Sequence, residues 1–158
     1  MPWLLALGCL LLACSTTKTP LSAQAQQAAR VESVVKELQE QMNRRNQPRI
    51  LSLLAPPLEG DREFADDLAA LFQRADPLRA VFVIERVWLL QPEMVRLDLH
   101  WTLHANLKPS GDTPAVGSRQ GSTTSGTARF IFAGKEPRLS AVQGDSPFSP
   151  TFDRSPLP

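Results

Sequence analysis

The sequence predicts an α+β fold in which N-terminal helices pack on a curved antiparallel sheet of about four strands. Two observations support this prediction. The spacing of apolar residues changes from about 3.6 to 2 after residue 78, so helical segments come first and strands follow. Residues 94–107 alternate between apolar and polar side chains along their whole length, which is typical of a strand whose sheet is buried on one face.

The first helix is expected to begin after Ser22, which is a favourable N-cap, and to run to about Asn46. Apolar residues recur there at alternating steps of three and four, so they form one buried stripe along the helix. The stripe consists of Ala28, Val31, Val35, Leu38 and Met42. We expect the helix to pack on its own domain, because two heptads are too few for a coiled coil.

Two further helices are expected before the sheet. Pro48 suits the first turn of a short helix over 48–55, which Pro56 and Pro57 end. Asp61 is a suitable N-cap for the next helix, and Asp76–Pro77 closes it. The buried stripe of this helix consists of Phe64, Leu68, Leu71 and Phe72.

Four strands are expected to follow the helices. Residues 80–90 are rich in branched and aromatic side chains, so we expect a central strand with both faces covered at one end. The strand over 95–107 has one apolar and one polar face. Residues 119–132 and 138–142 form the third and fourth strands, and 108–118 is expected to be a loop.

The first fourteen residues are uncharged and almost wholly apolar. About 12 apolar residues are too few to cross a hydrocarbon core of roughly 30 Å, but they have the length of a secretory signal. The run ends in Leu11-Leu12-Ala13-Cys14, which resembles the lipobox of bacterial lipoproteins. The resemblance implies cleavage after Ala13 and a lipid anchor of acyl chains, such as palmitate, on Cys14. Cys9, after Leu7-Gly8, is a second candidate.

The lipobox resemblance also implies a location in the cell envelope. Two or three acyl chains, at about 0.8 kcal/mol per buried methylene, hold a protein stably in a membrane. Ser15 rather than Asp follows Cys14, which in Gram-negative lipoproteins implies export to the outer membrane. We therefore expect a lipoprotein that is bound to the membrane through its N-terminal lipid, on the outer membrane, and that faces the periplasm.

The expected domain organisation has four parts: a signal peptide over 1–13, a lipidated tether over 14–21, the α+β domain over 22–147 and a Pro/Ser-rich tail over 148–158. The formal net charge is +1, with 17 Lys and Arg against 16 Asp and Glu. This balance gives no electrostatic reason to expect nucleic acid as a partner.

The order of elements over about residues 22–147 resembles the nuclear transport factor 2-like superfamily, also called cystatin-like or SnoaL-like. The resemblance rests on the long first helix, the helices at 48–54 and 64–72, the strand pair over 81–107 and the endings at 126–132 and 139–142. It implies a cone in which the first helix lies in the concave face of a bent sheet, and a homodimer through that sheet. Catalytic members carry an acid and a Tyr in the mouth of the cone, whereas this chain has no Tyr.

Four aromatic residues are candidates to line a pocket for a small apolar ligand, and a fully packed core is the alternative. These residues are Phe82, Trp88, Trp101 and Phe130. Asp98 and His100 lie two apart on one strand face, so they are catalytic candidates as an orienting carboxylate and a general base. The alternative is an ordinary solvated sheet face or a polar dimer surface. His100 and His104 are about 13 Å apart on a strand, too far for one ion, so we expect no metal and no cofactor.

The main functional hypothesis is a lipid-anchored cell-envelope lipoprotein whose small domain serves in binding or assembly without catalysis. One alternative is an isomerase- or dehydratase-like enzyme that holds a small molecule in the cone. Another is a structural accessory subunit of an envelope complex, which meets its partner through the polar face around Arg96, Asp98 and His100.

Overall fold

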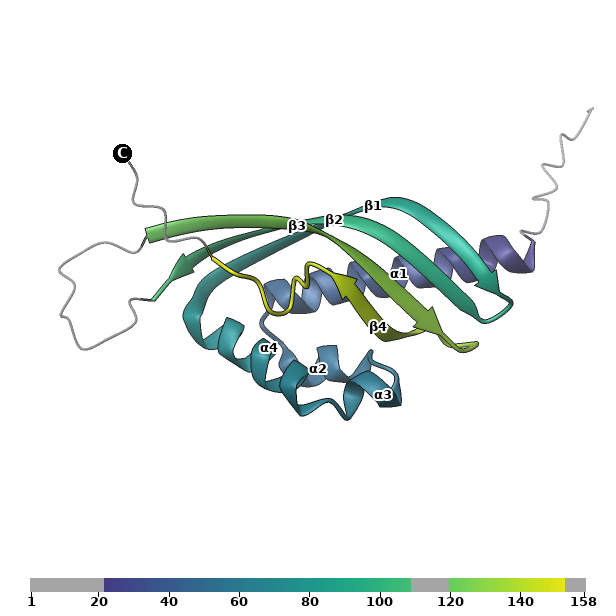
Figure 1. The fold of residues 1–158 in the computed structure, drawn as a ribbon, viewed down its shortest axis with the longest axis horizontal. Helices are drawn as coiled ribbons and strands as arrows, with labels where there is room; N and C mark the ends of the chain where they lie inside the picture. Colours follow the sequence, from purple (N-terminus) through teal and green to yellow (C-terminus); the bar gives the residue numbers. More distant parts are fainter. Residues whose placement is uncertain (1–21, 109–119, 153–158) are drawn as a thin grey trace, which may run out of the picture.

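A computed structural model describes residues 22–108 and 120–152. The helices are α1 (Ala23–Asn43), α2 (Gln47–Ser52), α3 (Pro56–Glu59) and α4 (Arg62–Arg74), and the strands are β1 (Ala75–Gln91), β2 (Met94–Leu107), β3 (Gln120–Ala133) and β4 (Arg138–Gly144). The strands form one antiparallel sheet in the order β1-β2-β3-β4. The sheet is bent and arches over the helices, with α1 directly beneath it (Figure 1). The predicted fold class is confirmed.

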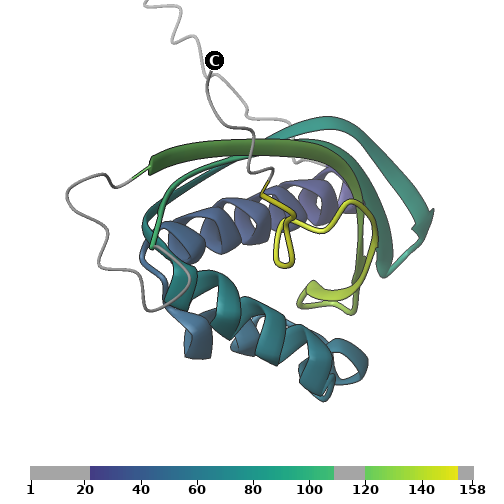
Figure 2. The same cartoon turned by 60° about the vertical axis from the view of Figure 1, so that its left-hand side comes forward.

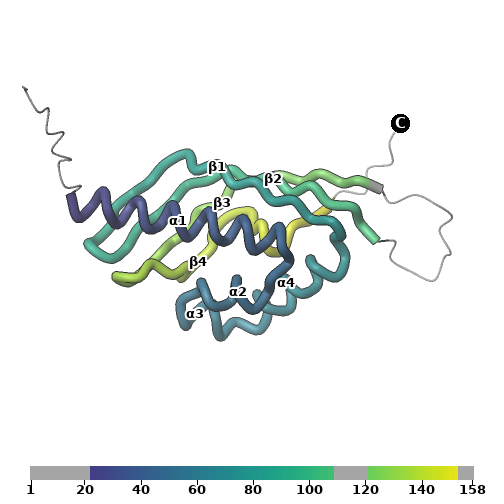
Figure 3. Tube along the Cα trace, turned by 180° about the vertical axis from the view of Figure 1, so that it is seen from behind, coloured from purple at the N-terminus to yellow at the C-terminus, as the bar shows by residue number. Residues whose placement is uncertain are grey.

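Helix α1 begins and packs as its sequence predicts. The Ser22 hydroxyl accepts a hydrogen bond from the Ala25 N–H at 3.2 Å, which caps the helix. The apolar stripe is buried except for the half-buried Ala28, and Val31, Leu38 and Met42 have no exposed surface. Figure 3 shows α1 running along one part of the sheet, beyond which the ends of β2 and β3 continue.

Side chains of α1 also bind the edge of the sheet. The backbone N–H of Ala80 donates to Asn43 Oδ1 at 2.5 Å, and that of Phe82 donates to Gln39 Oε1 at 2.7 Å. Both donors belong to β1, which is an edge strand and therefore has unpaired backbone groups on one side. The expectation of a central strand at 80–90 is thus wrong, because β1 pairs with β2 alone and α1 covers part of its free edge.

The connection between α2 and α4 differs from the expected one. Helix α2 ends at Ser52 instead of continuing to residue 55. Pro56 and Pro57 also begin a helix, because they are the first two residues of the single turn of α3. Proline is tolerated there, since the first N–H groups of a helix have no partner within the helix. Asp61 then caps α4 by accepting hydrogen bonds from the N–H groups of Glu63 and Phe64, as predicted.

The hydrophobic core lies between the concave face of the sheet and the helices. It extends past residue 147, where we expected the tail to begin, because Phe148 has no exposed surface and Phe152 is 9% exposed. Figure 2 shows this C-terminal segment inside the arch of the sheet. The expected signal peptide, the tether with Cys14 and residues 153–158 of the expected tail lie outside the described residues. None of the described helices is long and apolar enough to span a membrane.

Candidate active site

The inner face of the sheet is an apolar wall. Along β2 every second side chain points inward, and each of these is at most 5% exposed. The inward residues of β2 are Val95, Leu97, Leu99, Trp101, Leu103 and Ala105. Because none of them titrates, any acid–base group of the interior has to come from another element.

Aromatic rings fill the interior between this wall and α4. Phe82 of β1 meets Phe130 of β3 edge-on, with ring centroids 6.0 Å apart. Phe148 stacks on Phe130 at 5.9 Å and also meets Phe64 of α4 at 4.9 Å. Such contacts are worth about 0.5–1.5 kcal/mol each beyond the area they bury. Three of the four predicted pocket-lining residues, Phe82, Trp101 and Phe130, therefore lie in the interior of the cone.

Trp88, the fourth candidate, is corrected, because its indole lies on the outer face of the sheet and is 42% exposed. The reason is a β-bulge between Ile84 and Arg86. Before the bulge, the even-numbered residues of β1 oppose inward residues of β2, and Ile84 pairs with Leu99. After the bulge they oppose outward residues, so Trp88 pairs with Arg96. One extra residue thus exchanges the two faces of the strand.

An exposed carboxylate, that of Asp145, lies at the border between solvent and the apolar core. Asp145 follows β4 and is fixed to β3, since its N–H donates to the Thr127 carbonyl at 3.0 Å and its Oδ2 accepts from the Thr127 N–H at 3.3 Å. The indole N–H of Trp101 donates to the Asp145 carbonyl at 2.7 Å. Asp145 is exposed to solvent on one side and borders the Trp101 ring on the other.

Gly126 makes this arrangement sterically feasible. It pairs with Trp101, so a side chain at Gly126 would point to the inner face. A Cβ placed there would lie 2.7 Å from both the Asp145 Cβ and the Trp101 Cζ2, and 3.0 Å from the Asp145 Oδ2. A glycine at this position therefore lets a carboxylate and an indole share the space above the strand. Sequence reasoning missed Asp145, although a glycine opposite Trp101 in a predicted strand was a usable signal.

On the outer face, Asp98 is held by three partners. It accepts hydrogen bonds from the Trp88 indole N–H at 3.0 Å and from Arg129 Nε at 3.2 Å, and Arg96 Nε lies 3.5 Å away. The Arg96 guanidinium also lies 4.9 Å from the centre of the Trp88 ring. Burial raises the pKa of Asp98, but the hydrogen bonds from Trp88 and Arg129 and the charges of Arg96 and Arg129 outweigh it, so the pKa is below its ordinary value.

The predicted Asp98–His100 pair is not joined in the described part of the chain. The Asp98 oxygens contact Trp88, Arg129 and Arg96. No hydrogen bond between described residues links Asp98 to His100. His100 opposes Val83 and Thr127 in the two neighbouring strands. A catalytic role for the pair stays a prediction, and loss of a bell-shaped activity profile in His100→Ala is its test.

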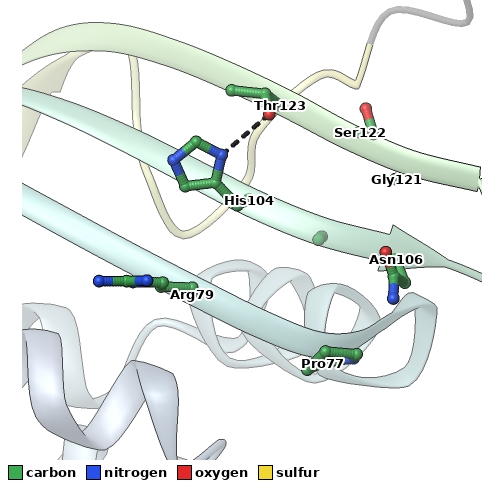
Figure 4. Close-up of a pocket in the computed structure, with 8 residues that line it drawn as sticks. Pro77, Arg79, His104, Asn106, Gly121, Ser122 and Thr123 are labelled. Atoms are coloured by element: carbon green, nitrogen blue, oxygen red, sulfur yellow. Dashed lines mark hydrogen bonds between the residues drawn. The ribbon is translucent and has the colours of Figure 1, made fainter.

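An open groove of about 210 Å³ lies at one end of the sheet, between the beginning of β1, the end of β2 and the beginning of β3. Figure 4 shows its lining, in which His104 Nδ1 lies 2.9 Å from the Thr123 hydroxyl and Arg79 extends beside them. The lining offers a guanidinium, an imidazole and hydroxyl groups but no carboxylate. Within residues 22–108 and 120–152, no group of three or more His, Cys, Asp or Glu side chains could hold a metal ion.

No protein-family model and no curated protein matches the sequence. Solved structures with the same fold do match. A hexachlorocyclohexane dehydrochlorinase of type 3 from Novosphingobium barchaimii LL02 superposes with a TM-score of 0.62 at 14% identity, over 83% of this chain and 91% of that one. A protein named as a scytalone dehydratase from Novosphingobium aromaticivorans gives 0.60 at 4% identity, over 77% and 86%. A nuclear transport factor 2-like protein from Salmonella enterica gives 0.58 at 8% identity, over 81% and 94%.

These likenesses show that the chain has the nuclear transport factor 2-like cone fold, as the order of its elements predicted. They also correct the main functional hypothesis. We expected a lipid-anchored envelope lipoprotein with a non-catalytic binding or assembly domain, but the structural neighbours are mostly enzymes, among them dehydrochlorinases and a dehydratase. The non-catalytic hypothesis is therefore not retained.

Proposed function

We propose that this protein is a small-molecule enzyme of the isomerase or dehydratase type that acts on a largely apolar substrate inside the cone. The position of Asp145 is the observation that carries the proposal. Its exposed carboxylate lies near the buried Trp101 ring, at the border between solvent and the apolar core, and it is oriented by its bond to the Thr127 N–H. A fixed carboxylate at the border of an apolar region suits proton abstraction from carbon.

The chemistry assigns a role to each group. One oxygen of Asp145 takes a proton from a substrate carbon, and the electron pair of the broken C–H bond forms a carbon–carbon double bond. A leaving group on the neighbouring carbon departs with its own bonding pair, which completes an elimination. The indole N–H of Trp101 donates to the backbone carbonyl of Asp145 and so holds the residue that carries the base in place.

The structural neighbours support elimination from a ring. Two of them are hexachlorocyclohexane dehydrochlorinases, whose substrate is a six-membered carbocycle that loses hydrogen chloride. We therefore choose hexachlorocyclohexane and a cyclic β-hydroxyketone as the first two substrates for assay. Release of chloride from one, and loss of water from the other, report the same type of step.

The test compares three carboxylates in the full chain. Asp145→Asn keeps the shape of the side chain but removes the base, so turnover is expected to fall by about 10²- to 10⁴-fold. Glu85→Gln, at the exposed bulge of β1, is the matched control and keeps the wild-type rate. Asp98→Asn distinguishes the two faces of the sheet. Equal rates in wild type and Asp145→Asn, or a loss confined to Asp98→Asn, would rule out Asp145 as the base.

We propose separately that Cys14 carries the lipid anchor and that the domain faces the periplasm from the outer membrane. The support is the lipobox resemblance of Leu11-Leu12-Ala13-Cys14. Intact-mass analysis of the membrane fraction is expected to show a chain that begins at Cys14 and bears acyl chains. An unmodified chain that still carries Met1 would contradict the proposal. A homodimer through the outer face of the sheet also stays a prediction, and sedimentation of the detergent-solubilised chain tests it.

A further inference from the structure

The ring of Phe148 occupies a defined position inside the cone. It has no exposed surface, and it lies between Phe130 of β3 and Phe64 of α4. The Phe130 ring is nearly parallel to it, at 20°, and the Phe64 ring is tilted by 54°. Aromatic surfaces on two sides make this position suitable for one flat six-membered ring.

The chain that carries Phe148 has few directional ties to the rest of the domain. Among the described residues, the Thr124 hydroxyl donates to the Thr151 carbonyl at 3.1 Å, and this bond is exposed. The Phe148 N–H donates to the Ser146 hydroxyl, which belongs to the same segment. Residues 146–152 are therefore held mainly by the burial of Phe148 and Phe152.

Attachment by apolar burial has a specific consequence. The hydrophobic effect is non-directional and scales with the apolar area removed from water. A ligand ring that takes the place of the Phe148 ring regains most of the burial that Phe148 loses. Apolar cavities of about 150 Å³ stay dry and bind benzene, so such an exchange needs no polar contact.

Asp145 is tied differently and stays in place during such an exchange. Its two hydrogen bonds to Thr127 extend the pairing of β4 with β3 by one residue. The chain leaves the sheet directly after it, with Gly144 at a φ of 85° and Pro147 two residues beyond Asp145. The segment can thus move about Ser146 while the carboxylate remains bonded to Thr127 of β3.

We infer that residues 146–152 are a removable cover and that Phe148 occupies the position of the substrate ring. The substrate class that follows is a compound with one six-membered carbocycle, aromatic or saturated. This inference rests on the proposed function, because it names the ligand of the same interior and leaves Asp145 beside it.

The test is a titration of the full chain with toluene, followed by hydrogen exchange and by nuclear magnetic resonance. In the wild type, toluene is expected to bind and to speed amide exchange in 146–152, while exchange in β2 stays unchanged. Phe148→Ala is expected to bind toluene at least tenfold more tightly, because the wild type must first displace its own ring. Phe132→Ala is the control, since it removes an equally buried phenyl ring of β3 whose contact with Phe130 is at 6.4 Å.

Two results would overturn the inference. One is a wild type that shows no toluene binding up to the solubility of toluene, or binds it without faster exchange in 146–152. The other is equal affinity in Phe148→Ala and Phe132→Ala, which marks an ordinary cavity. If Phe148→Ala does not fold, the effect of toluene on amide exchange in residues 146–152 of the wild type is by itself the test of the inference.

The outcome also separates this inference from the proposed function. If toluene releases the cover but Asp145→Asn keeps the wild-type rate, the ring site is supported and the proposed reaction is contradicted. If turnover depends on Asp145 but toluene does not release the cover, the proposed reaction is supported and the ring site is contradicted. In that case the substrate enters elsewhere, and Phe148 is a permanent part of the core.

Discussion

Two tryptophan–aspartate pairs lie on opposite faces of the same sheet. On the outer face, the Trp88 indole donates to a side-chain oxygen of Asp98 at 3.0 Å. On the inner face, the Trp101 indole donates to the backbone carbonyl of Asp145 at 2.7 Å. The donor is the same in both pairs, but the acceptor differs, and this difference decides what each carboxylate can do.

The Asp98 carboxylate is occupied. Trp88 and Arg129 donate to its two oxygens, and the Arg96 guanidinium lies close by. These partners lower the pKa of Asp98, which makes its carboxylate a weaker base. On the inner face, Trp101 bonds to the main chain of Asp145 instead, and the one hydrogen bond given to the Asp145 carboxylate by the described residues is that from the Thr127 N–H to Oδ2. The comparison favours the carboxylate with fewer partners, that of Asp145, over the Asp98 cluster as the candidate base.

The largest expected effect compares the two faces of β2 at adjacent residues. Leu99 points inward and is 1% exposed, whereas His100 points outward. Leu99→Ala is expected to lower the free energy of unfolding by about 2–5 kcal/mol through the cavity it leaves. His100→Ala is expected to lower it by less than about 0.5 kcal/mol. Urea denaturation of the two variants checks this, and equal losses would mean that the two faces are not distinct.

A smaller loss of stability is expected at Gly126, which lies beside Asp145 and Trp101. Gly126→Ala places a Cβ 2.7 Å from the Asp145 Cβ and the Trp101 Cζ2, so these groups must move apart. We expect a loss of about 1–3 kcal/mol in the free energy of unfolding, together with a changed Trp101 fluorescence. Gly121→Ala is the matched control in the same strand, because its nearest neighbour would be the Asn106 Oδ1 at 3.5 Å. Similar losses in both variants would argue against close contact between Asp145 and Trp101.

The hydrogen bonds donated by the Trp101 and Trp88 indoles are also expected to differ in how much they stabilise the fold. Trp101→Phe leaves the Asp145 carbonyl without its donor and is expected to cost about 1–3 kcal/mol in the free energy of unfolding. Trp88→Phe removes a donor from an exposed cluster whose two arginines remain, so about 0.5 kcal/mol is expected. Thermal unfolding of both variants provides the comparison. A larger loss in Trp88→Phe would reverse the ranking of the two pairs.

The smallest effect concerns the pH dependence of the outer cluster. The pKa of Asp98 in the folded protein lies below its ordinary value of 3.8, so its charged form stabilises the fold above that pH. This contribution, less than about 1 kcal/mol, is lost as the pH falls from 3.8 through the lowered pKa. Asp98→Asn is expected to show a flatter decline of stability below pH 3.8 than the wild type. Parallel curves for the two proteins would show that Asp98 is not stabilised by its partners.

Much of the fold could be predicted from local patterns, because those patterns have local causes. Ser22 and Asp61 cap helices by bonding to N–H groups two or three residues away. The alternation along β2 reports directly which side chains face the core. Elements whose boundaries depend on such contacts were therefore predicted within a few residues.

The candidate site could not be predicted in the same way, because it depends on distant contacts. A single bulge after Ile84 moved Trp88 to the outer face, and no residue pattern marks the insertion. Phe148 was assigned to a Pro/Ser-rich tail, yet it is buried by Phe64 and Phe130, which precede it in sequence by many residues. Asp145 gained its position from Gly126 and Trp101 on two other strands.

The central claim is that the inner face of the cone, at Trp101 and Asp145, receives a ring compound and the outer face does not. Nuclear magnetic resonance resolves the indole N–H signals of the tryptophans, so one titration with cyclohexanone reports on both faces at once. The account predicts a saturating shift of the Trp101 indole signal while the Trp88 signal stays in place. A shift of the Trp88 signal alone, or no shift of either signal, would contradict it.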